Sequence, residues 1–465
     1  MSEEKNKIYN KFLKASEEKA FDNEHRNKIR YNISKYEDAV NKGKNLYSDA
    51  ELAKRRAAIS KNKVLNELDK YLIEFEANFI TRGGKVIWAQ DSNDVIREVL
   101  SIVKKHNAKK VVKSKSMITE EIGINEVLEK NGVESLETDL GEFIVQLDDD
   151  KPYHIVTPAM HKSKKDIANL FNQKYGTPPD STPEEITSFV RNLLREKFVA
   201  ADIGITGCNF LIAETGAVCL TENEGNALLS TSFPRVHIAI AGIEKILPSL
   251  NDLDLFWPLL ATNGTGQFLT VYNSIFTGPK QDDEIDGPEE MYVILLDNGR
   301  TNLLAQTKQR RALSCIRCGA CLNYCPIYKN IGGHAYGTTY SGPIGAVITP
   351  WLKDTDDYQH LSFASSLCGK CTEVCPVKIP LHHLLLYNRR DIVAKKLYKK
   401  SDKWVMFAYK QVMLRRGLLE TGNYKIKNWV LGKTFRKYWG SRRELPKFTE
   451  KSFNKLWNEL REFDI

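Results

Sequence analysis

The sequence predicts an α/β domain preceded by helices and followed by a small cysteine-rich domain and a helical tail. Three observations support this fold class. Strand-like and helix-like apolar runs alternate between about residues 76 and 300. The segment before them is charged, has helical apolar spacing and is almost free of glycine. Seven of the nine cysteines lie between Cys315 and Cys375.

A chain of 465 residues is longer than a domain with a single hydrophobic core normally is, so several domains are expected. Alternating strands and helices form mainly parallel sheets. We therefore predict four segments: helices over 1–75, the α/β domain over 76–300, the cysteine-rich domain over 301–390 and a basic helical tail over 391–465.

Short apolar runs mark the first elements of the α/β domain. We expect strands at 85–89 and 110–112, each followed by a helix, at 92–103 and about 120–131.

The same alternation is expected to continue with strands at 143–147 and 154–156. Further strands are predicted at 236–241 and 291–296, the second of them closing the domain. An exposed acidic loop is expected at 281–288.

Glycine-rich turns occupy the middle of this domain. Strand ends in α/β folds are where ligands bind, so a small-molecule site near Gly207 and Glu214 is one interpretation. The alternative is that the glycines only permit turn geometry. The segment lacks a G-x-G-x-x-G or Walker pattern, so no nucleotide site is predicted. Cys208 and Cys219 are expected to be buried, inert thiols.

The first cysteine motif is Cys315-x2-Cys318-x2-Cys321-x3-Cys325-Pro, the spacing of bacterial two-cluster ferredoxins. Three closely spaced thiolates wrap one iron–sulfur cubane, and the fourth cysteine serves a second one. The sequence therefore predicts two ferredoxin-type clusters and a role in electron transfer.

The second motif, Cys368-x2-Cys371-x3-Cys375-Pro, repeats the last three positions of the first, and Ser365 stands where a fourth cysteine is expected. Crossed ligation assigns the first [4Fe–4S] cluster to Cys315, Cys318, Cys321 and Cys375. It assigns the second to Cys325, Cys368 and Cys371. Ser365, another side chain, water or a partner completes the second site, or that site holds a three-iron cluster.

Zinc is the main alternative, because structural zinc also takes four thiolates. Zinc spacing does not demand a third cysteine two residues on, nor a trailing Cys-Pro twice. Disulfides are disfavoured in a reducing cytosol. An open iron beside Ser365 that binds substrate is a further alternative.

The basic surplus is confined to the C-terminal end. Residues 376–465 carry 22 Lys+Arg and 8 Asp+Glu, whereas the whole chain has a net charge of +9. Such helices meet an acidic partner or an anionic membrane surface, or are simply solvated. Nucleic acid is not an expected partner, because no recognised nucleic-acid module accompanies the charge. No signal peptide or membrane span is evident. We expect a cytoplasmic protein, with peripheral contact to the inner membrane face as an option.

Together, Gly204–Asn209, Glu214–Ala217, the four-then-three cysteines and the basic tail resemble the lactate utilization protein B family over nearly the full length. The resemblance implies an α/β fold shared with CoA transferases and ribose-5-phosphate isomerase. It also implies an electron-transporting subunit of a system that oxidises L-lactate to pyruvate and supports growth on lactate. The implied partners are the other subunits and a membrane-peripheral or quinone-linked acceptor.

Two other hypotheses stay open at this point. In one, the α/β domain is itself an isomerase-like or transferase-like enzyme and the clusters are its redox input. In the other, the chain is a scaffold whose clusters are structural.

Overall fold

The computed structural model describes residues 3–398, 400–440 and 443–463. Residues 1–2 of the predicted helical segment lie outside the described residues, as do 399, 441–442 and 464–465 of the predicted tail. The chain divides into two compact units, Met1–Ile392 and Val393–Ile465. The division of the first unit into three domains stays a prediction.

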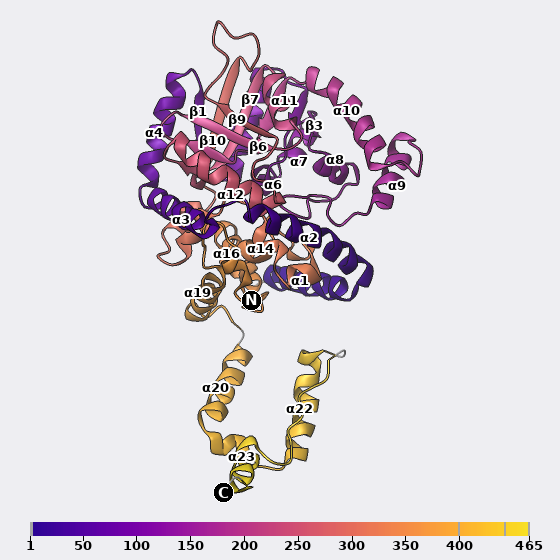
Figure 1. Ribbon diagram of the computed structural model, residues 1–465, viewed down its shortest axis with the longest axis vertical. Helices are drawn as coiled ribbons and strands as arrows, with labels where there is room; N and C mark the ends of the chain where they lie inside the picture. Colours follow the sequence, from indigo (N-terminus) through magenta and orange to yellow (C-terminus); the bar gives the residue numbers. More distant parts are fainter. Residues whose placement is uncertain (1–2, 399, 441–442, 464–465) are drawn as a thin grey trace. The chain divides into compact units, whose positions relative to one another are not determined.

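A parallel six-stranded sheet lies at the centre of the first unit (Figure 1). All of its neighbouring strands pair in parallel. This confirms the predicted α/β fold class. In spatial order its strands are β1 (Lys85–Ala89), β10 (Glu290–Leu296), β7 (Val236–Gly242), β4 (Ile203–Thr206), β2 (Lys110–Lys113) and β3 (Glu134–Glu137).

Successive side chains of β7 point to opposite faces of this sheet, as strand geometry requires. Ile238 and Ile240 pack in one core together with the helix α5 (Ser92–Lys105). Ala239 and Ala241 pack in another core, with the helix α4 (Leu68–Thr81) and the second sheet. That sheet has the order β8 (Ile246–Leu247), β5 (Phe210–Ile212), β6 (Ala217–Glu222) and β9 (Tyr272–Phe276).

Two of the predicted strands are wrong. The run 143–147 lies in the helix α8 (Leu140–Leu147), which Asp139 caps by accepting from the Glu142 N–H at 3.1 Å. Residues 154–156 form a bend without strand pairing. A five-residue apolar run does not distinguish a strand from one face of a short helix. The strand β3 was missed, because its sequence is half polar.

The helix predicted at about 120–131 is two helices, α6 (Met117–Ile122) and α7 (Ile124–Lys130). They are separated at Gly123, whose φ of 65° is left-handed and ends α6. The other helices of this domain are α9 (Lys164–Tyr175), α10 (Pro183–Val199), α11 (Asn226–Ser232), η1 (Ile243–Lys245), η2 (Leu250–Asp252) and α12 (Leu253–Thr265).

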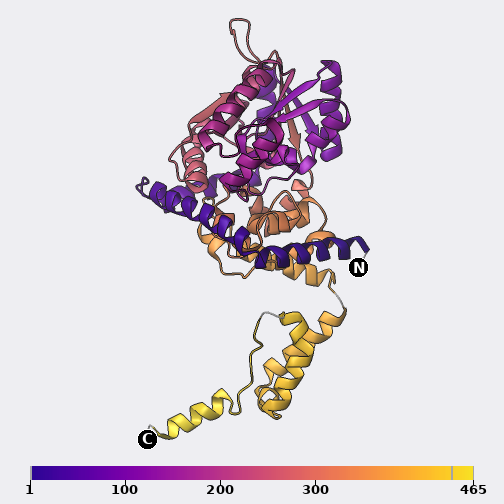
Figure 2. The ribbon, with the colours of Figure 1, turned by 90° about the vertical axis from the view of Figure 1, so that its right-hand side faces the viewer.

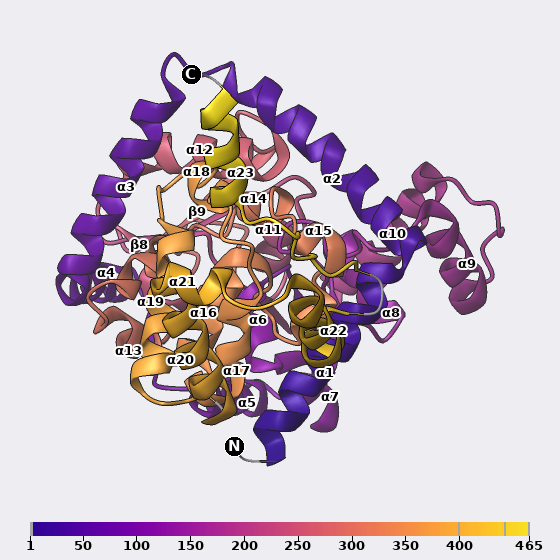
Figure 3. The same ribbon diagram turned by 90° about the horizontal axis from the view of Figure 1, so that it is seen from below.

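Long N-terminal helices pack against the cysteine-containing part of the same unit. Figures 2 and 3 show α1 (Glu3–Phe21) and α2 (Asn23–Lys44) running along it. The helix α3 (Ala50–Asn66) contacts the short helix η3 (Gln309–Ser314). Ile29 and Ile33 of α2 share one hydrophobic core with the buried cysteines. These helices therefore cover the cysteine region.

Short helices build the cysteine region itself, and η3 leads directly into its first cysteine, Cys315. The other elements are α13 (Arg300–Leu304), α14 (Ala320–Asn323), α15 (Tyr328–Ile331), η4 (His334–Tyr336), α16 (Gly342–Leu352), α17 (Thr355–Tyr358), η5 (Gln359–Phe363), α18 (Lys370–Glu373) and α19 (Leu381–Ala394).

The second unit is helical and leaves large apolar side chains exposed, among them Trp404, Phe407, Trp429 and Phe453. Over the described part of the chain, every helix is too short or too polar to cross a lipid bilayer. The helices of this unit are α20 (Lys400–Leu414), α21 (Arg416–Glu420), α22 (Tyr424–Trp439) and α23 (Phe453–Phe463).

Candidate metal centre

The two cysteine motifs have the same backbone conformation. Arg317 and Gly319 in the first loop have φ of 62° and 79°, and Leu367 and Gly369 in the second have φ of 55° and 81°. A short helix follows each loop, α14 after the first and α18 after the second. Left-handed arginine and leucine are uncommon, so their recurrence at matching positions marks a shared loop structure.

The loops also share a hydrogen bond at their first position. The Arg317 N–H donates to Cys315 Sγ at 3.4 Å, and the Leu367 N–H donates to Ser365 Oγ at 3.1 Å. Ser365 therefore occupies in the second loop the place that Cys315 occupies in the first.

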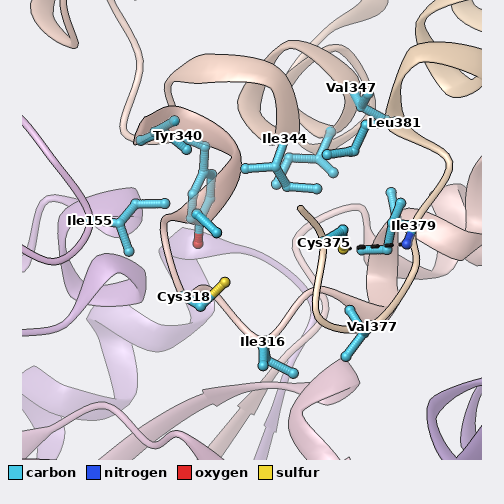
Figure 4. Close-up of a cluster of buried hydrophobic side chains, with 14 of the residues drawn as sticks. Ile155, Ile316, Cys318, Tyr340, Ile344, Val347, Cys375, Val377, Ile379 and Leu381 are labelled. Carbon is cyan, nitrogen blue, oxygen red and sulfur yellow. Dashed lines mark hydrogen bonds between the residues drawn. The ribbon is translucent and has the colours of Figure 1, made fainter. Parts of the chain in front are cut away.

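Four cysteine side chains line one small cavity. Its remaining walls are largely apolar, and Figure 4 shows Cys318 and Cys375 among Ile316, Ile344 and Val377. The Ile379 N–H donates to Cys375 Sγ at 3.3 Å (Figure 4). The four cysteines are Cys315, Cys318, Cys321 and Cys375. The fourth comes from the second motif, more than fifty residues along the chain.

The seven thiols fall into two adjoining groups. Burial raises the pKa of Cys321 well above its ordinary value. Neighbouring thiols raise it further, and they are those of Cys315, Cys318, Cys371 and Cys375. Burial likewise raises the pKa of Cys371 to about 12, and Cys325 and Cys368 add to that shift.

This donor set fits an iron–sulfur cluster. Several thiols in an apolar pocket, each costly to ionise alone, are stabilised as thiolates by a metal centre. Thiolate sulfur with backbone N–H donors is the environment of such clusters. In the second group Cys325 and Cys371 are buried and Cys368 is exposed. Which cysteine ligates which cluster stays a prediction.

A buried ion network ties the first cysteine loop to the α/β part. Arg300 donates to both carboxylate oxygens of Glu121, at 3.1 and 2.8 Å, and to Glu244 at 2.8 Å. The other oxygen of Glu244 accepts from Arg317 Nη2 at 3.4 Å. The Tyr340 hydroxyl donates to Glu121 at 2.6 Å. The loop is therefore held against the ends of the sheet strands.

The predicted small-molecule site is only partly assembled. Gly207 lines a large cavity at the carboxyl edge of the parallel sheet. Glu214 is exposed, accepts from the Leu250 N–H at 3.3 Å and does not line this cavity. Cys208 lines it, and burial raises the pKa of that thiol to about 12, so little thiolate exists.

Sequence analysis missed Lys245 and Arg317, which line the same cavity. One signal was available, because Lys245 closely follows the apolar strand 236–242 and strand ends form ligand sites. Arg317 gave no such signal, since only the fold brings the cysteine loop to this edge.

Two family models match separate parts of the chain. Residues 72–296 match the LUD domain, and residues 311–379 match the 4Fe-4S dicluster domain. Among solved structures, a DUF162 family protein from Deinococcus radiodurans aligns with a TM-score of 0.28 and 14% identity. That alignment covers 49% of this chain and 98% of that one.

Curated relatives match over most of their length. Lactate utilization protein B of Bacillus pumilus is 49% identical, over 78% of this chain and 75% of that protein. The protein of the same name from Bacillus cytotoxicus is 51% identical, over 71% of this chain and 70% of that protein. By this similarity the chain belongs to the lactate utilization protein B family.

Proposed function

We propose that this protein is the iron–sulfur electron-transfer subunit of a multi-subunit system that oxidises L-lactate to pyruvate and so allows growth on lactate. The lactate part rests on the family's name. The observation that carries the electron-transfer part is the cavity lined by four cysteines beside a second group of three.

In this proposal Cys315, Cys318, Cys321 and Cys375 hold one [4Fe–4S] cluster. Cys325, Cys368 and Cys371 hold a second, with Ser365 as its fourth ligand. When bound, such clusters supply one-electron transfer. The match of the Ser365 and Cys315 hydrogen bonds supports Ser365 as that ligand.

The chain's own residues provide a dry and fixed environment. Apolar side chains such as Ile316 and Val377 keep water from the first cavity, and the N–H groups of Arg317 and Ile379 orient two sulfurs. Low solvent exposure and N–H···S bonds are what set the potential of a bound cluster.

We propose further that the α/β part has the fold shared with CoA transferases and ribose-5-phosphate isomerase. Its helix–sheet–sheet layering supports this. The partners in the proposal are the other subunits of the lactate system and an electron acceptor at the membrane periphery. In this proposal the acceptor is contacted by the basic second unit, where Trp404 and Phe407 are exposed.

The test is iron and sulfide content with EPR, on protein purified and reconstituted without oxygen, before and after dithionite. About eight irons per chain and magnetically coupled signals on reduction are expected for two adjacent [4Fe–4S] clusters. Zinc in place of iron would contradict the proposal and favour a structural role.

A matched pair of variants links the clusters to growth. Cys318→Ser should remove one cluster and abolish growth on lactate while the α/β part stays folded. Cys219→Ala, which removes a buried thiol that belongs to neither motif, should leave both unchanged. Normal growth of Cys318→Ser cells with that cluster absent would exclude the electron-transfer role.

A further inference from the structure

A large cavity of about 500 Å³ opens at the carboxyl edge of the parallel sheet. It lies where the strand order reverses, because β2 leads to β3 on one side and β4 leads to β7 on the other. Ligands of open α/β sheets bind at such a switch point. The segments after β2 and β4 meet there, since a Cβ on Gly207 would lie 2.5 Å from Ser116 Oγ.

The first cysteine loop forms one wall of this cavity. Arg317 and Cys318 line it, and Cys318 also lines the small four-cysteine cavity. A molecule in the large cavity therefore lies against the loop of the first proposed cluster.

Two cationic groups face this cavity with hydrogen-bonding capacity left over. The Arg317 side chain is 11% exposed, and its buried Nη1 has no acceptor among the described residues. Lys245 is half-buried and lines the same cavity, and its Nζ donates to no acceptor in the described part of the chain. Burial and the charge of Arg317 lower the pKa of Lys245. A buried donor without a partner is costly, so a bound anion would satisfy Arg317 Nη1, and it would also give Lys245 Nζ an acceptor.

The neighbouring acids do not supply that anion. Glu244 Oε2 is engaged by Arg300 at 2.8 Å, and Oε1 reaches Arg317 Nη2 at only 3.4 Å. Glu121 is bound by Arg300, Asn298 and Tyr340. The acids elsewhere on the cavity wall bond other groups. Asp139 pairs with Lys115 at 3.1 Å, Glu222 accepts from the N–H groups of Ala227 and Leu228, and Glu224 accepts from the Leu140 N–H at 3.1 Å.

We propose that this cavity binds a small organic carboxylate whose oxygens accept from Lys245 Nζ and Arg317 Nη1. Two open donors match the two oxygens of a carboxylate, whereas a phosphate calls for more donors than the pair offers. The apolar wall, which includes Met117 and Leu260, suits a short carbon chain. The choice of L-lactate and pyruvate as probes rests on the proposed function, while the cavity and its cations do not.

A competing explanation is that Lys245 and Arg317 only balance the negative charge of the first proposed cluster, since the Cys315 thiol is near both. That explanation predicts no saturable ligand. It predicts instead a lower reduction potential when Lys245 loses its charge.

The experiment is calorimetric titration of fully iron-loaded, anaerobic protein with pyruvate, L-lactate and inorganic phosphate. Lys245→Met should weaken carboxylate binding at least tenfold, and Lys245→Arg should retain most of it. Lys280→Met, at an exposed lysine, is the matched control and should bind as the unchanged protein does. Pyruvate should also perturb the EPR signal of the reduced protein, and this perturbation should be lost in Lys245→Met.

Three outcomes would overturn the inference. They are no saturable binding of either acid, equal binding by Lys245→Met, or phosphate binding as tightly as the acids. If the unchanged protein binds no ligand and Lys245→Met has a lower reduction potential, the charge-balancing role of Lys245 is established instead. Iron and EPR are measured on the same samples. A protein with both clusters that binds no acid therefore defeats this inference alone, whereas a protein without iron defeats the proposed function.

Discussion

Ser365 and Cys315 occupy equivalent places in two loops of one backbone form, each accepting a hydrogen bond from the N–H two residues ahead. Ser365 Oγ accepts at 3.1 Å, and the larger sulfur atom of Cys315 accepts at 3.4 Å. One loop thus presents a thiol where the other presents a hydroxyl. Oxygen is a weaker ligand for iron–sulfur clusters than thiolate, so we expect the second site to be the more labile one.

Ser365→Cys should therefore strengthen the second site. After brief exposure to air, the unchanged protein should fall from about eight irons to about seven and show an oxidised three-iron EPR signal. Ser365→Cys should keep about eight irons and lack that signal, because a fourth thiolate retains the labile iron. The control is Ser366→Cys, whose side chain is exposed one residue away. Equal iron loss in both variants would argue against a ligand role for Ser365.

Crossed ligation predicts which substitutions have the same effect. Cys375→Ala should remove the same EPR signal as Cys318→Ala, although the two residues belong to different motifs. Cys325→Ala should instead match Cys371→Ala. EPR of the four reduced variants checks this, and sequential ligation within each motif would pair the spectra the other way.

Glu121→Gln should destabilise the first unit. The side chain is 4% exposed and accepts from Arg300, Asn298 and Tyr340. Burial disfavours its charge, but Arg300 outweighs this and holds the pKa of Glu121 below its ordinary value. Removing one partner of a buried pair costs about 3–5 kcal/mol, so the thermal midpoint measured by circular dichroism should fall by several degrees. Glu129→Gln, on the exposed side of α7, should leave it unchanged.

Acid should destabilise the fold through His237. Burial lowers the pKa of His237 to about 3, against an ordinary value of 6.5, and Nε2 lies 2.8 Å from Thr206 Oγ1. Between these pH values the unfolded chain binds a proton that the folded chain does not. The stability is thus complete above pH 6.5 and declines as pH falls, at up to about 1.4 kcal/mol per pH unit.

His237→Phe removes this pH-dependent loss of stability. The thermal midpoint of the variant should therefore fall less than that of the unchanged protein between pH 7 and 5.5. Loss of clusters in acid affects both proteins and cancels in the comparison. His383→Phe, at an exposed histidine, serves as the control. Parallel curves for all three proteins would show that His237 does not contribute.

The second unit should associate with anionic vesicles. Basic amphipathic helices bind such surfaces through buried apolar area and charge attraction together. Sedimentation with phosphatidylglycerol vesicles should capture the full-length protein at low salt, and Trp404→Ala with Phe407→Ala should reduce capture several-fold. Neutral vesicles should capture little. Unaltered capture by the double variant would exclude α20 as the contact.

The sequence was most informative where the spacing of cysteines along the chain or a long apolar run determines the structure. The strands at 236–241 and 291–296 were predictable because they are mostly apolar, as expected for strands buried on both faces. The same reasoning failed for 143–147, because so short an apolar run does not distinguish a helix from a strand. It also failed for β3, because Glu134 and Glu137 interrupt the apolar pattern by which a strand is recognised. The cysteine motifs were recognisable because the spacing of the cysteines within each motif is a local sequence pattern.

Sites built by distant segments were not predictable. Lys245 follows a strand of the α/β part and Arg317 lies between two cysteines, and no local pattern shows that both line one cavity. Their proximity depends on the network through Glu244 and Arg300, which forms only once the cysteine region packs on the sheet.

The proposed crossed ligation also predicts an order for biogenesis. The small cavity is incomplete without Cys375, and the other thiol group joins Cys325 to residues that are synthesised more than forty positions later. A nascent chain that has emerged only as far as the first motif offers three cysteines for one centre and one for the other. Under crossed ligation we therefore expect both centres to be completed only after the second motif has been synthesised, instead of one after the other during translation.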